Sequence, residues 1–155
     1  VLHHRRMDTK TCKTIAVLGG LGTLVHAERT AELACHLCEG YDVDLILAYP
    51  IIVPQSMPLN VPLPDQERAA KDAIALGMQV AARFGCRTEY RIFRHRRPAD
   101  AILELAKQER AERIVLGIRI NPNVPHDMDR VESAESEILH RAECEVIVNR
   151  EPIVA

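Results

Sequence analysis

Short apolar runs alternate along this chain with segments of helical periodicity, and this alternation limits the choice of fold more than any other feature. Five runs have the length, aliphatic content and boundaries typical of strands, and they lie at 13–20, 43–49, 88–94, 113–118 and 144–149. The segments between them carry apolar residues at spacings of three or four, as in helices with one buried face, and they lie at 27–38, 73–84, 102–106 and 131–142. Strand and helix therefore alternate from the first strand to the last.

Strands that alternate with helices form a parallel sheet, because each right-handed crossover packs its helix back onto the sheet. We therefore predict an α/β fold, a single doubly wound domain with a five-stranded parallel sheet and helices on both faces. The charges of the third strand indicate a sheet edge. Sheets of this kind bind ligands outside the carboxyl ends of their strands. The loops that follow the strands are therefore the candidate binding region, at 19–24, 49–64, 94–98 and 117–130.

Composition indicates one domain and argues against several functions. The chain has 155 residues, of which 47% are hydrophobic, so it can bury a full core without disulfides or a metal. We place the domain at 14–150, with a basic N-terminal segment or linker at 1–13 and a tail at 151–155. A net charge of −2 and an aromatic content of 3% argue against a nucleic-acid partner. Five scattered cysteines, and no apolar run as long as a membrane span, favour a cytoplasmic protein with reduced thiols.

The last third of the chain carries a resemblance to a known family. Residues 111–117 read AERIVLG, and residues 138–148 read ILHRAECEVIV. Together they resemble the closing half of the universal stress protein family, in which a strand ending in glycine leads through a loop to a last helix and strand. Residues 97–102, RPADAI, resemble the start of that family's third helix. The resemblance implies the strand order 3-2-1-4-5 of adenine-nucleotide alpha-hydrolase-like folds.

Two further segments resemble one variant of this family, the domain at the cytosolic end of amino-acid permease-type transporters. They are the proline-rich segment 49–64 and the charge-rich segment 94–102. The N-terminal segment 1–13 is basic, as expected beside a membrane on its cytosolic side. We therefore expect a covalently linked transporter membrane domain and a place at the cytosolic face of the plasma membrane. The remnant of a processed tag is the competing interpretation of segment 1–13.

The loop after the fourth predicted strand departs from the phosphate-binding pattern of the family. In nucleotide-binding members of the family, this loop resembles the pattern G-x-x-G-x9-G-[ST], in which glycines bring backbone N–H groups close to phosphates at a helix start. Gly117 and Ser133 match the two ends of this pattern. Ile120 and Glu132 replace the inner glycines, with eleven residues between them instead of nine. Because Glu132 would also bring a negative charge towards a phosphate, we interpret the loop as a degenerate phosphate cradle.

The candidate ligand-binding residues surround this loop and the ends of the first, second and fourth predicted strands. They are Gly19, Gly20, Ala48, Tyr49, Leu116, Gly117, Arg119 and Ser133. The main interpretation has no cofactor, and the alternative is ATP, AMP or cyclic di-AMP. Phosphates of a cyclic dinucleotide could contact Arg119 together with Arg94, Arg96 and Arg97. The competing interpretation is that these arginines and His126 are solvated loop charges.

No pattern in the chain indicates catalysis or a resident metal. Cys35 and Cys38 form a CxxC within a helical pattern, but a structural zinc needs four ligands, so we expect buried thiols that act as small hydrophobic side chains. The Gly19–Gly22 run lacks the small residue that a dinucleotide fingerprint requires at Val25. The serines have no identifiable histidine–acid partner. We therefore predict no catalytic residue, no metal ligand and no enzyme activity.

Two segments indicate a partner surface. Five prolines interleaved with aliphatic residues between Pro50 and Pro64 exclude a helix or central strand and predict an extended surface loop. That loop either packs on a second copy or another domain, or folds back over its own sheet edge. The resemblance to universal stress proteins implies dimerisation through the last strand, so Glu145–Val148 is a candidate for edge pairing in a homodimer. The sequence thus predicts a non-catalytic regulatory or dimerisation module, with a stand-alone nucleotide-binding protein as the alternative.

Overall fold

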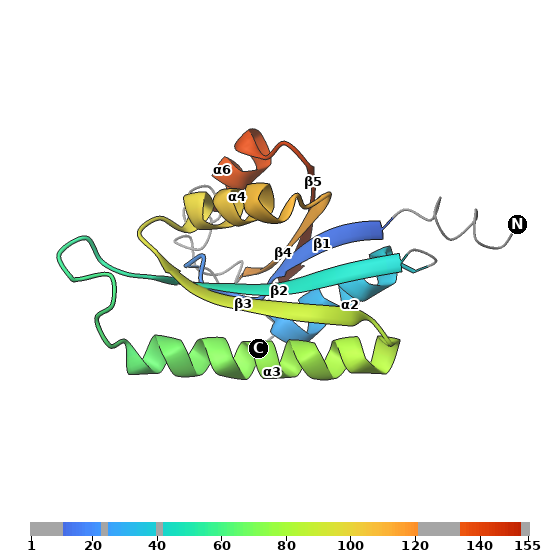
Figure 1. Cartoon of the computed structure of the whole chain (residues 1–155), viewed down its shortest axis with the longest axis horizontal. Helices are drawn as coiled ribbons and strands as arrows, with labels where there is room; N and C mark the ends of the chain where they lie inside the picture. Colours follow the sequence, from blue (N-terminus) through green and yellow to red (C-terminus); the bar gives the residue numbers. More distant parts are fainter. Residues whose placement is uncertain (1–10, 23–24, 40–41, 121–133, 153–155) are drawn as a thin grey trace, which may run out of the picture.

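The computed structural model describes residues 11–22, 25–39, 42–120 and 134–152. Its centre is a five-stranded parallel sheet in the order β3-β2-β1-β4-β5 (Figure 1). The strands are β1 Thr11–Val17, β2 Asp42–Ile52, β3 Arg87–His95, β4 Arg113–Ile120 and β5 Glu145–Pro152. The predicted fold class, the strand order and the edge position of the third strand are confirmed.

Helices cover both faces of the sheet. On one face α2 (Ala27–Leu37) packs with α3 (Pro64–Phe84), and on the other α4 (Pro98–Glu109) packs with α6 (Ala134–Arg141) (Figure 1). The predicted helix at 131–142 is confirmed from residue 134 onward, and its first residues lie outside the described ranges. Strand β1 begins inside the predicted linker and β5 runs into the predicted tail, so the sheet is longer at both ends than expected. Residues 1–10 and 153–155 lie outside the described part of the chain.

Strand β1 is buried on both faces, because a separate apolar cluster fills the space on each side of the sheet. Successive side chains of a strand point to opposite faces. Ala16 packs in the cluster under α2 and α3, while Ile15 and Val17 pack in the cluster under α4 and α6. All three side chains are at most 1% exposed. The neighbouring strands β2 and β4 contribute to both clusters in the same way, so the core extends across the three central strands.

Strand β2 extends further than the sequence predicts, through Pro50. Beyond Ala48 the strand has no β1 neighbour, since Val17, the last residue of β1, pairs with Ala48. Pro50 pairs only with Phe93 of the edge strand β3, so its missing N–H group breaks no bond to a second neighbour. At the other end of the proline-rich segment, Pro64 starts α3, a position where helices tolerate proline. The expectation that these prolines exclude a helix is therefore wrong at Pro64, whereas Pro50 lies where β2 has only one neighbouring strand and does not contradict the exclusion of a central strand.

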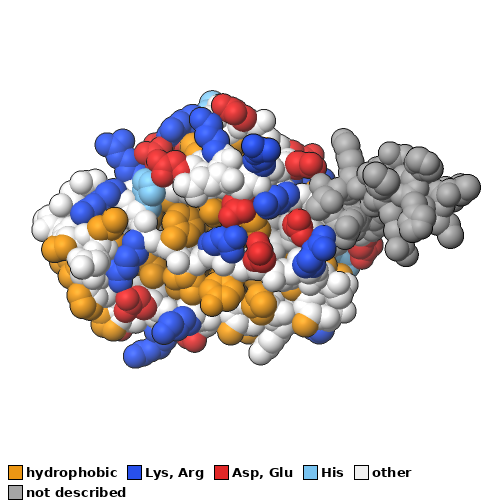
Figure 2. Space-filling view, viewed as in Figure 1, with side chains coloured by type: hydrophobic (Ala, Val, Ile, Leu, Met, Phe, Trp, Pro, Cys, Tyr) orange, Lys and Arg blue, Asp and Glu red, His pale blue; other side chains and the backbone are white. Residues whose placement is uncertain are grey.

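Helix α3 presents a different face to the sheet from the one that its apolar spacing predicts. The sequence places Leu76 and Phe84 on the buried face, but these side chains are 44% and 36% exposed. A Cβ atom at Gly77 would lie 2.7 Å from a methyl carbon of Leu18, so the helix lies too close to the sheet for bulky side chains along this line. Hydrophobic side chains consequently remain on the outer surface over α3 and β3 (Figure 2). The residues that α3 buries are Ala70, Ile74, Gly77, Val80 and Ala81.

Helix α2 also approaches the sheet closely, at Gly117 of β4. The buried side chain of Thr30 occupies the space above this glycine, and its hydroxyl donates a hydrogen bond to the His26 carbonyl oxygen at 3.0 Å. A Cβ atom at Gly117 would lie 2.0 Å from Thr30 Oγ1. Packing between α2 and β4 therefore explains why no side chain fits at Gly117.

We expect Gly117→Ala to lower the free energy of unfolding by about 1–3 kcal/mol, because the added methyl group overpacks a buried contact. Thr30→Ala removes the obstructing hydroxyl, so the double variant should be more stable than the sum of the two single changes predicts. Urea unfolding of the wild type and the three variants, followed by circular dichroism, measures this coupling. Strictly additive losses would contradict the packing explanation.

Candidate functional site

The sheet register brings six of the eight predicted ligand-binding residues to one place. Val17, the last residue of β1, pairs with Ala48 of β2 on one side and with Leu116 of β4 on the other. The Leu18 N–H group donates a hydrogen bond to the Ala48 carbonyl oxygen at 2.9 Å, which continues the contact with β2 past the end of β1. The residues that meet at this carboxyl edge of the sheet are Gly19, Gly20, Ala48, Tyr49, Leu116 and Gly117.

The turn after β1 packs tightly on the end of β2. Gly20 has a φ of +86°, and a Cβ atom there would lie 2.1 Å from the Pro50 carbonyl oxygen. A Cβ atom at Gly19 would lie 2.4 Å from Tyr49 Cε2, so the aromatic ring lies directly against the turn. Burial raises the pKa of the Tyr49 hydroxyl, which therefore stays protonated at neutral pH. The turn thus combines a close backbone approach with a neutral aromatic side chain.

A pocket of about 400 Å³ opens beside this turn. None of its lining residues within the described ranges is charged, and these residues carry only backbone groups, one hydroxyl and one amide as polar groups. Apolar walls with a few neutral hydrogen-bonding groups suit a flat aromatic heterocycle better than a polyanion. The lining residues are Gly20, Leu21, Gly22, Tyr49, Pro50, Ile52, Gln66 and Pro98.

Among the described lining residues of this pocket, Gln66 lies outside every loop predicted to bind a ligand. It belongs to the first turn of α3, which begins nine residues before the helix that the apolar spacing predicts at 73–84. The signal for this earlier start is Pro64, since proline is typical of the first position of a helix. A start at Pro64 places Gln66 close to the end of β2.

Five of the predicted residues can contribute only backbone atoms to a site, among them Gly19 and Gly20, which have no side chain. The side chains of Ala48 and Leu116 are 0% and 1% exposed and belong to the core under α4 and α6. Gly117 is covered by Thr30, so the fold accounts for this glycine without a phosphate. The two predicted residues that are not among the six at the carboxyl edge are Arg119 and Ser133. Arg119 lies in β4 with its side chain outside the described part of the chain, and Ser133 lies outside it altogether.

The loop that resembles a phosphate cradle falls mostly on residues that the structure does not describe. Residues 121–133, which include His126 and Glu132, lie outside the described ranges. The structure therefore tests neither the presence nor the loss of a phosphate cradle. Its degenerate character therefore stays a prediction from the sequence.

Arg94 and Arg96, which we considered as contacts for a cyclic dinucleotide, bind the proline-rich loop instead. Arg94 and Arg96 each donate hydrogen bonds to two carbonyl oxygens of that loop, at distances between 2.6 and 3.1 Å. Arg94 also forms an ion pair with Glu67 at 2.7 Å. Both arginines are therefore engaged with the protein, which contradicts their interpretation as solvated loop charges and leaves them poorly placed for a phosphate. The four carbonyl oxygens belong to Pro54, Met57, Leu59 and Val61.

The proline-rich loop between β2 and α3 projects from the sheet (Figure 1). The side chains of Met57 and Leu59 are 41% and 46% exposed, and Figure 2 shows hydrophobic side chains along the loop. The alternative in which the loop folds back and buries its aliphatic side chains on its own sheet edge is therefore wrong for these two residues. Packing of the loop on a second copy or another domain stays a prediction.

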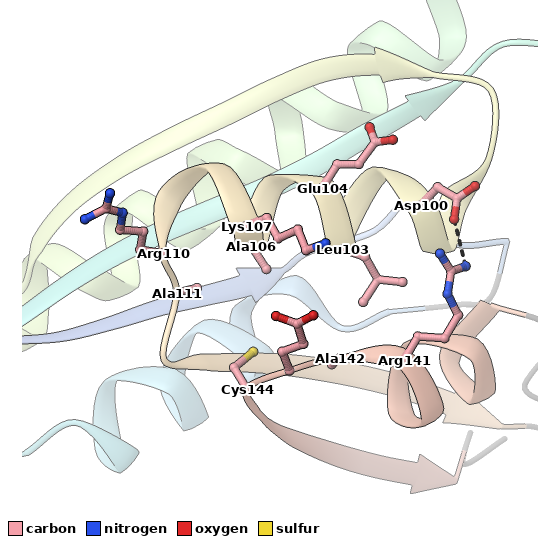
Figure 3. Close-up of a pocket in the computed structure, with 11 residues that line it drawn as sticks. Asp100, Leu103, Glu104, Ala106, Lys107, Arg110, Ala111, Arg141, Ala142 and Cys144 are labelled. Carbon is pink, nitrogen blue, oxygen red and sulfur yellow. Dashed lines mark hydrogen bonds and ion pairs between the residues drawn. The ribbon is translucent and has the colours of Figure 1, made fainter.

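A second cavity, of about 610 Å³, lies between α4 and α6 (Figure 3). Charged side chains of both signs line it, and at one end Arg141 donates a hydrogen bond to Asp100 Oδ1 at 2.8 Å. This bond lowers the pKa of the Asp100 carboxyl. The cavity lies along the helices rather than beyond the strand ends, where doubly wound sheets bind ligands. Among the residues that the structure describes, no predicted ligand-binding residue lines it.

Comparison with known proteins identifies the family of the chain. The universal stress protein family matches residues 17–150. A search of curated proteins found no match.

Solved structures share the fold at low sequence identity. A universal stress protein from Archaeoglobus fulgidus matches with a TM-score of 0.67 and 17% identity, over 96% of this chain and 98% of its own. The universal stress protein of the same organism in complex with dAMP matches with a TM-score of 0.66 and 16% identity, over 90% and 98%. A universal stress protein family protein from Arabidopsis thaliana with AMP bound matches with a TM-score of 0.59 and 13% identity, over 90% and 91%. Since the family match spans most of the sequence and the fold agrees, the chain belongs to the universal stress protein family.

Proposed function

We propose that this domain binds an adenine nucleotide, with the base in the uncharged pocket beside the glycine turn. The observation that carries the proposal is the pocket itself, which joins the turn after β1, the end of β2 and the first turns of α3 and α4. Its neutral walls suit a nucleobase. Its place outside the carboxyl ends of the central strands is the usual binding position in doubly wound sheets.

Ligands bound to proteins of similar fold support nucleotide binding over a regulatory module without a ligand. The structure from Archaeoglobus fulgidus is a complex with dAMP, and the one from Arabidopsis thaliana has AMP bound. Both ligands are adenine nucleoside monophosphates. They favour the alternative drawn from the sequence, a nucleotide-binding protein, over a module that has lost its ligand.

Charge favours a monophosphate over ATP in this chain. Residues 127–145 contain seven acidic side chains against two arginines, and no cation lines the described part of the pocket. Ile120 and Glu132 also replace the two inner glycines of the phosphate-binding pattern of nucleotide-binding family members. A single phosphate group brings only about two negative charges at neutral pH, so it meets less repulsion than a triphosphate.

The role that we propose is non-catalytic. The Ser136 hydroxyl lies 3.5 Å from His140 Nδ1, a serine–histidine contact that the sequence analysis did not identify. The same nitrogen lies 2.7 Å from the Ser136 carbonyl oxygen, which only accepts hydrogen bonds, so Nδ1 carries a proton and donates a hydrogen bond to it. An Nδ1 atom that carries this proton cannot accept one from the serine, so the pair lacks a general base.

A cytoplasmic location and a link to a transporter membrane domain remain proposals from the sequence. They rest on segments 49–64 and 94–102 and on the basic residues of 1–13. Within the described ranges, no helix is both long enough and apolar enough to span a bilayer. Whether coding sequence for apolar helices adjoins this domain in its gene decides the transporter proposal.

A homodimer through β5 is a second proposal, and one side chain favours it. Strand β5 is an edge strand, and Val146 and Val148 pack against the core under α4 and α6. Ile147 points to the opposite face, where it is half-buried and belongs to neither core cluster of the described residues. A second copy paired along β5 would cover both Ile147 and the open backbone edge.

Calorimetric titration of the purified domain with AMP, ATP and cyclic di-AMP tests the ligand proposal. AMP should bind more tightly than ATP. Gln66→Trp should weaken AMP binding at least about tenfold, or about 1.4 kcal/mol, because the indole fills the pocket from the first turn of α3. Gln79→Trp adds the same bulk to an exposed position of the same helix and should leave AMP binding unchanged.

Three outcomes of this titration would contradict the proposal in different ways. Absence of binding at high protein concentration would remove nucleotide binding altogether. Equal AMP binding by the wild type and the Gln66→Trp variant would place the ligand outside the pocket. Tighter binding of ATP than of AMP would refute the charge argument and leave the pocket in place.

Light scattering after size exclusion tests the homodimer. The wild type should be a dimer, and Ile147→Lys should convert it to a folded monomer because a desolvated charge opposes strand pairing. Leu139→Lys, at a 51% exposed position of α6, should remain a dimer. A wild type that is monomeric at high concentration would refute the dimer.

A further inference from the structure

Four of the five cysteines lie in two facing pairs. The Sγ atoms of Cys12 on β1 and Cys38 at the end of α2 are 4.0 Å apart. Cys35 on α2 forms a thiol hydrogen bond with Cys86, which precedes β3. Each cysteine of the CxxC therefore has its partner on a different element of the fold. The predicted burial of Cys35 and Cys38 is confirmed, but their two partners were missed.

The Cys12–Cys38 pair is enclosed by the core and shares one hydroxyl. The two side chains are 7% and 1% exposed and belong to the cluster under α2 and α3. Thr14 Oγ1 lies 3.3 Å from Cys12 Sγ and 3.2 Å from Cys38 Sγ. A single hydroxyl in contact with both sulfur atoms holds the two thiols towards each other.

A cation lies beside this pair. Arg113 Nη1 donates a hydrogen bond to the Leu37 carbonyl oxygen at 3.1 Å and lies 3.6 Å from Cys38 Sγ. Burial raises the pKa of the Cys38 thiol, whereas the nearby guanidinium favours the thiolate. The thiolate that reacts is therefore a minor species at neutral pH, and it forms beside Arg113, within reach of Cys12.

We propose that Cys12 and Cys38 are a redox-active dithiol that closes to a disulfide when a small hydroperoxide reaches the core. A disulfide bond is about 2.05 Å long, so the two sulfur atoms must approach by about 2 Å. Cys38 is the C-cap of α2, with φ −104° and ψ 7°, and its side chain can therefore turn without disturbing the interior of the helix. The other partner, Cys12, is held in β1.

The reaction needs only the two thiols and one hydroperoxide. The Cys38 thiolate attacks the terminal oxygen of the hydroperoxide, so that an S–O bond forms and the O–O bond breaks. Cys38 becomes a sulfenic acid, and the hydroxide or alkoxide that leaves takes up the proton that the thiol had lost. The Cys12 sulfur then attacks the Cys38 sulfenic acid, loses its proton and expels hydroxide, which is protonated to water. With hydrogen peroxide the two thiols are oxidised to one disulfide, and the peroxide is reduced to two water molecules.

A Cys12–Cys38 bond would tie the end of α2 to the first strand. The cross-link joins positions that are distant in the chain, so it restricts the unfolded state and should raise the melting temperature of the oxidised protein. The fifth cysteine, Cys144, lines the cavity between α4 and α6, and its half-buried thiol serves as an internal control.

Peptide mapping of the oxidised full chain tests the proposal. The reduced protein is treated with hydrogen peroxide, unfolded in the presence of an alkylating reagent, digested and analysed by mass spectrometry. We expect a cross-linked peptide pair that contains Cys12 and Cys38, its loss on treatment with dithiothreitol, and a higher melting temperature before reduction. Cys144→Ser should form the same cross-link at the same rate.

Single variants separate the dithiol from general thiol oxidation. Cys12→Ser and Cys38→Ser should each abolish the cross-link and the rise in melting temperature while retaining the circular dichroism spectrum of the wild type. Full alkylation of Cys12 and Cys38 after peroxide treatment would overturn the proposal. Oxidation of either residue to a sulfinic acid without a cross-link, or a cross-link confined to Cys35 and Cys86, would also overturn it.

Discussion

The register of β1 between β2 and β4 determines where the candidate site lies. Val17 pairs with Ala48 on one side and Leu116 on the other, and both faces of the strand are buried. A slip of one residue would exchange the side chains of the two core clusters, so this register is strongly specified. Because β1 ends there while β2 continues, the glycine turn packs against Pro50 and the pocket forms beside it. The position of the proposed nucleotide thus follows from the packing of the central strands.

Glycines at this edge of the sheet have two different physical explanations. Gly117 lies under Thr30, and a side chain there would collide with α2 whether or not a ligand binds. Gly20 combines a positive φ with close contact to the Pro50 carbonyl oxygen, and it lines the pocket. In this chain Gly117 is therefore explained by helix–strand packing, without a contact to a phosphate. In this chain the nucleotide proposal depends on the pocket beside Gly20 and does not require a phosphate role for Gly117.

Sequence patterns predicted the sheet because two-faced burial gives long apolar runs, and they failed where small residues or distant contacts decide the structure. The buried face of α3 is rich in Ala and Gly, so the large residues Leu76 and Phe84 misled the periodicity. Hydrogen bonds from Arg94 and Arg96 to loop carbonyl oxygens leave no trace in residue spacing. The Cys12–Cys38 contact joins residues 26 positions apart, and only the pairing of elements reveals it. The strand ends that form the site could be predicted from the sequence. The contribution of Gln66 could not, because it depends on where α3 begins.

The most direct test of the nucleotide site is a ¹H–¹⁵N correlation spectrum recorded during titration with AMP. The amide signals of Gly20, Leu21, Gly22 and Ile52 should shift together and saturate with a single affinity, because these residues line one pocket. The amide signals of residues that line the cavity between α4 and α6 should not shift. Shifts concentrated on residues such as Leu103, Lys107 and Arg110 would move the ligand to that other cavity and contradict the account.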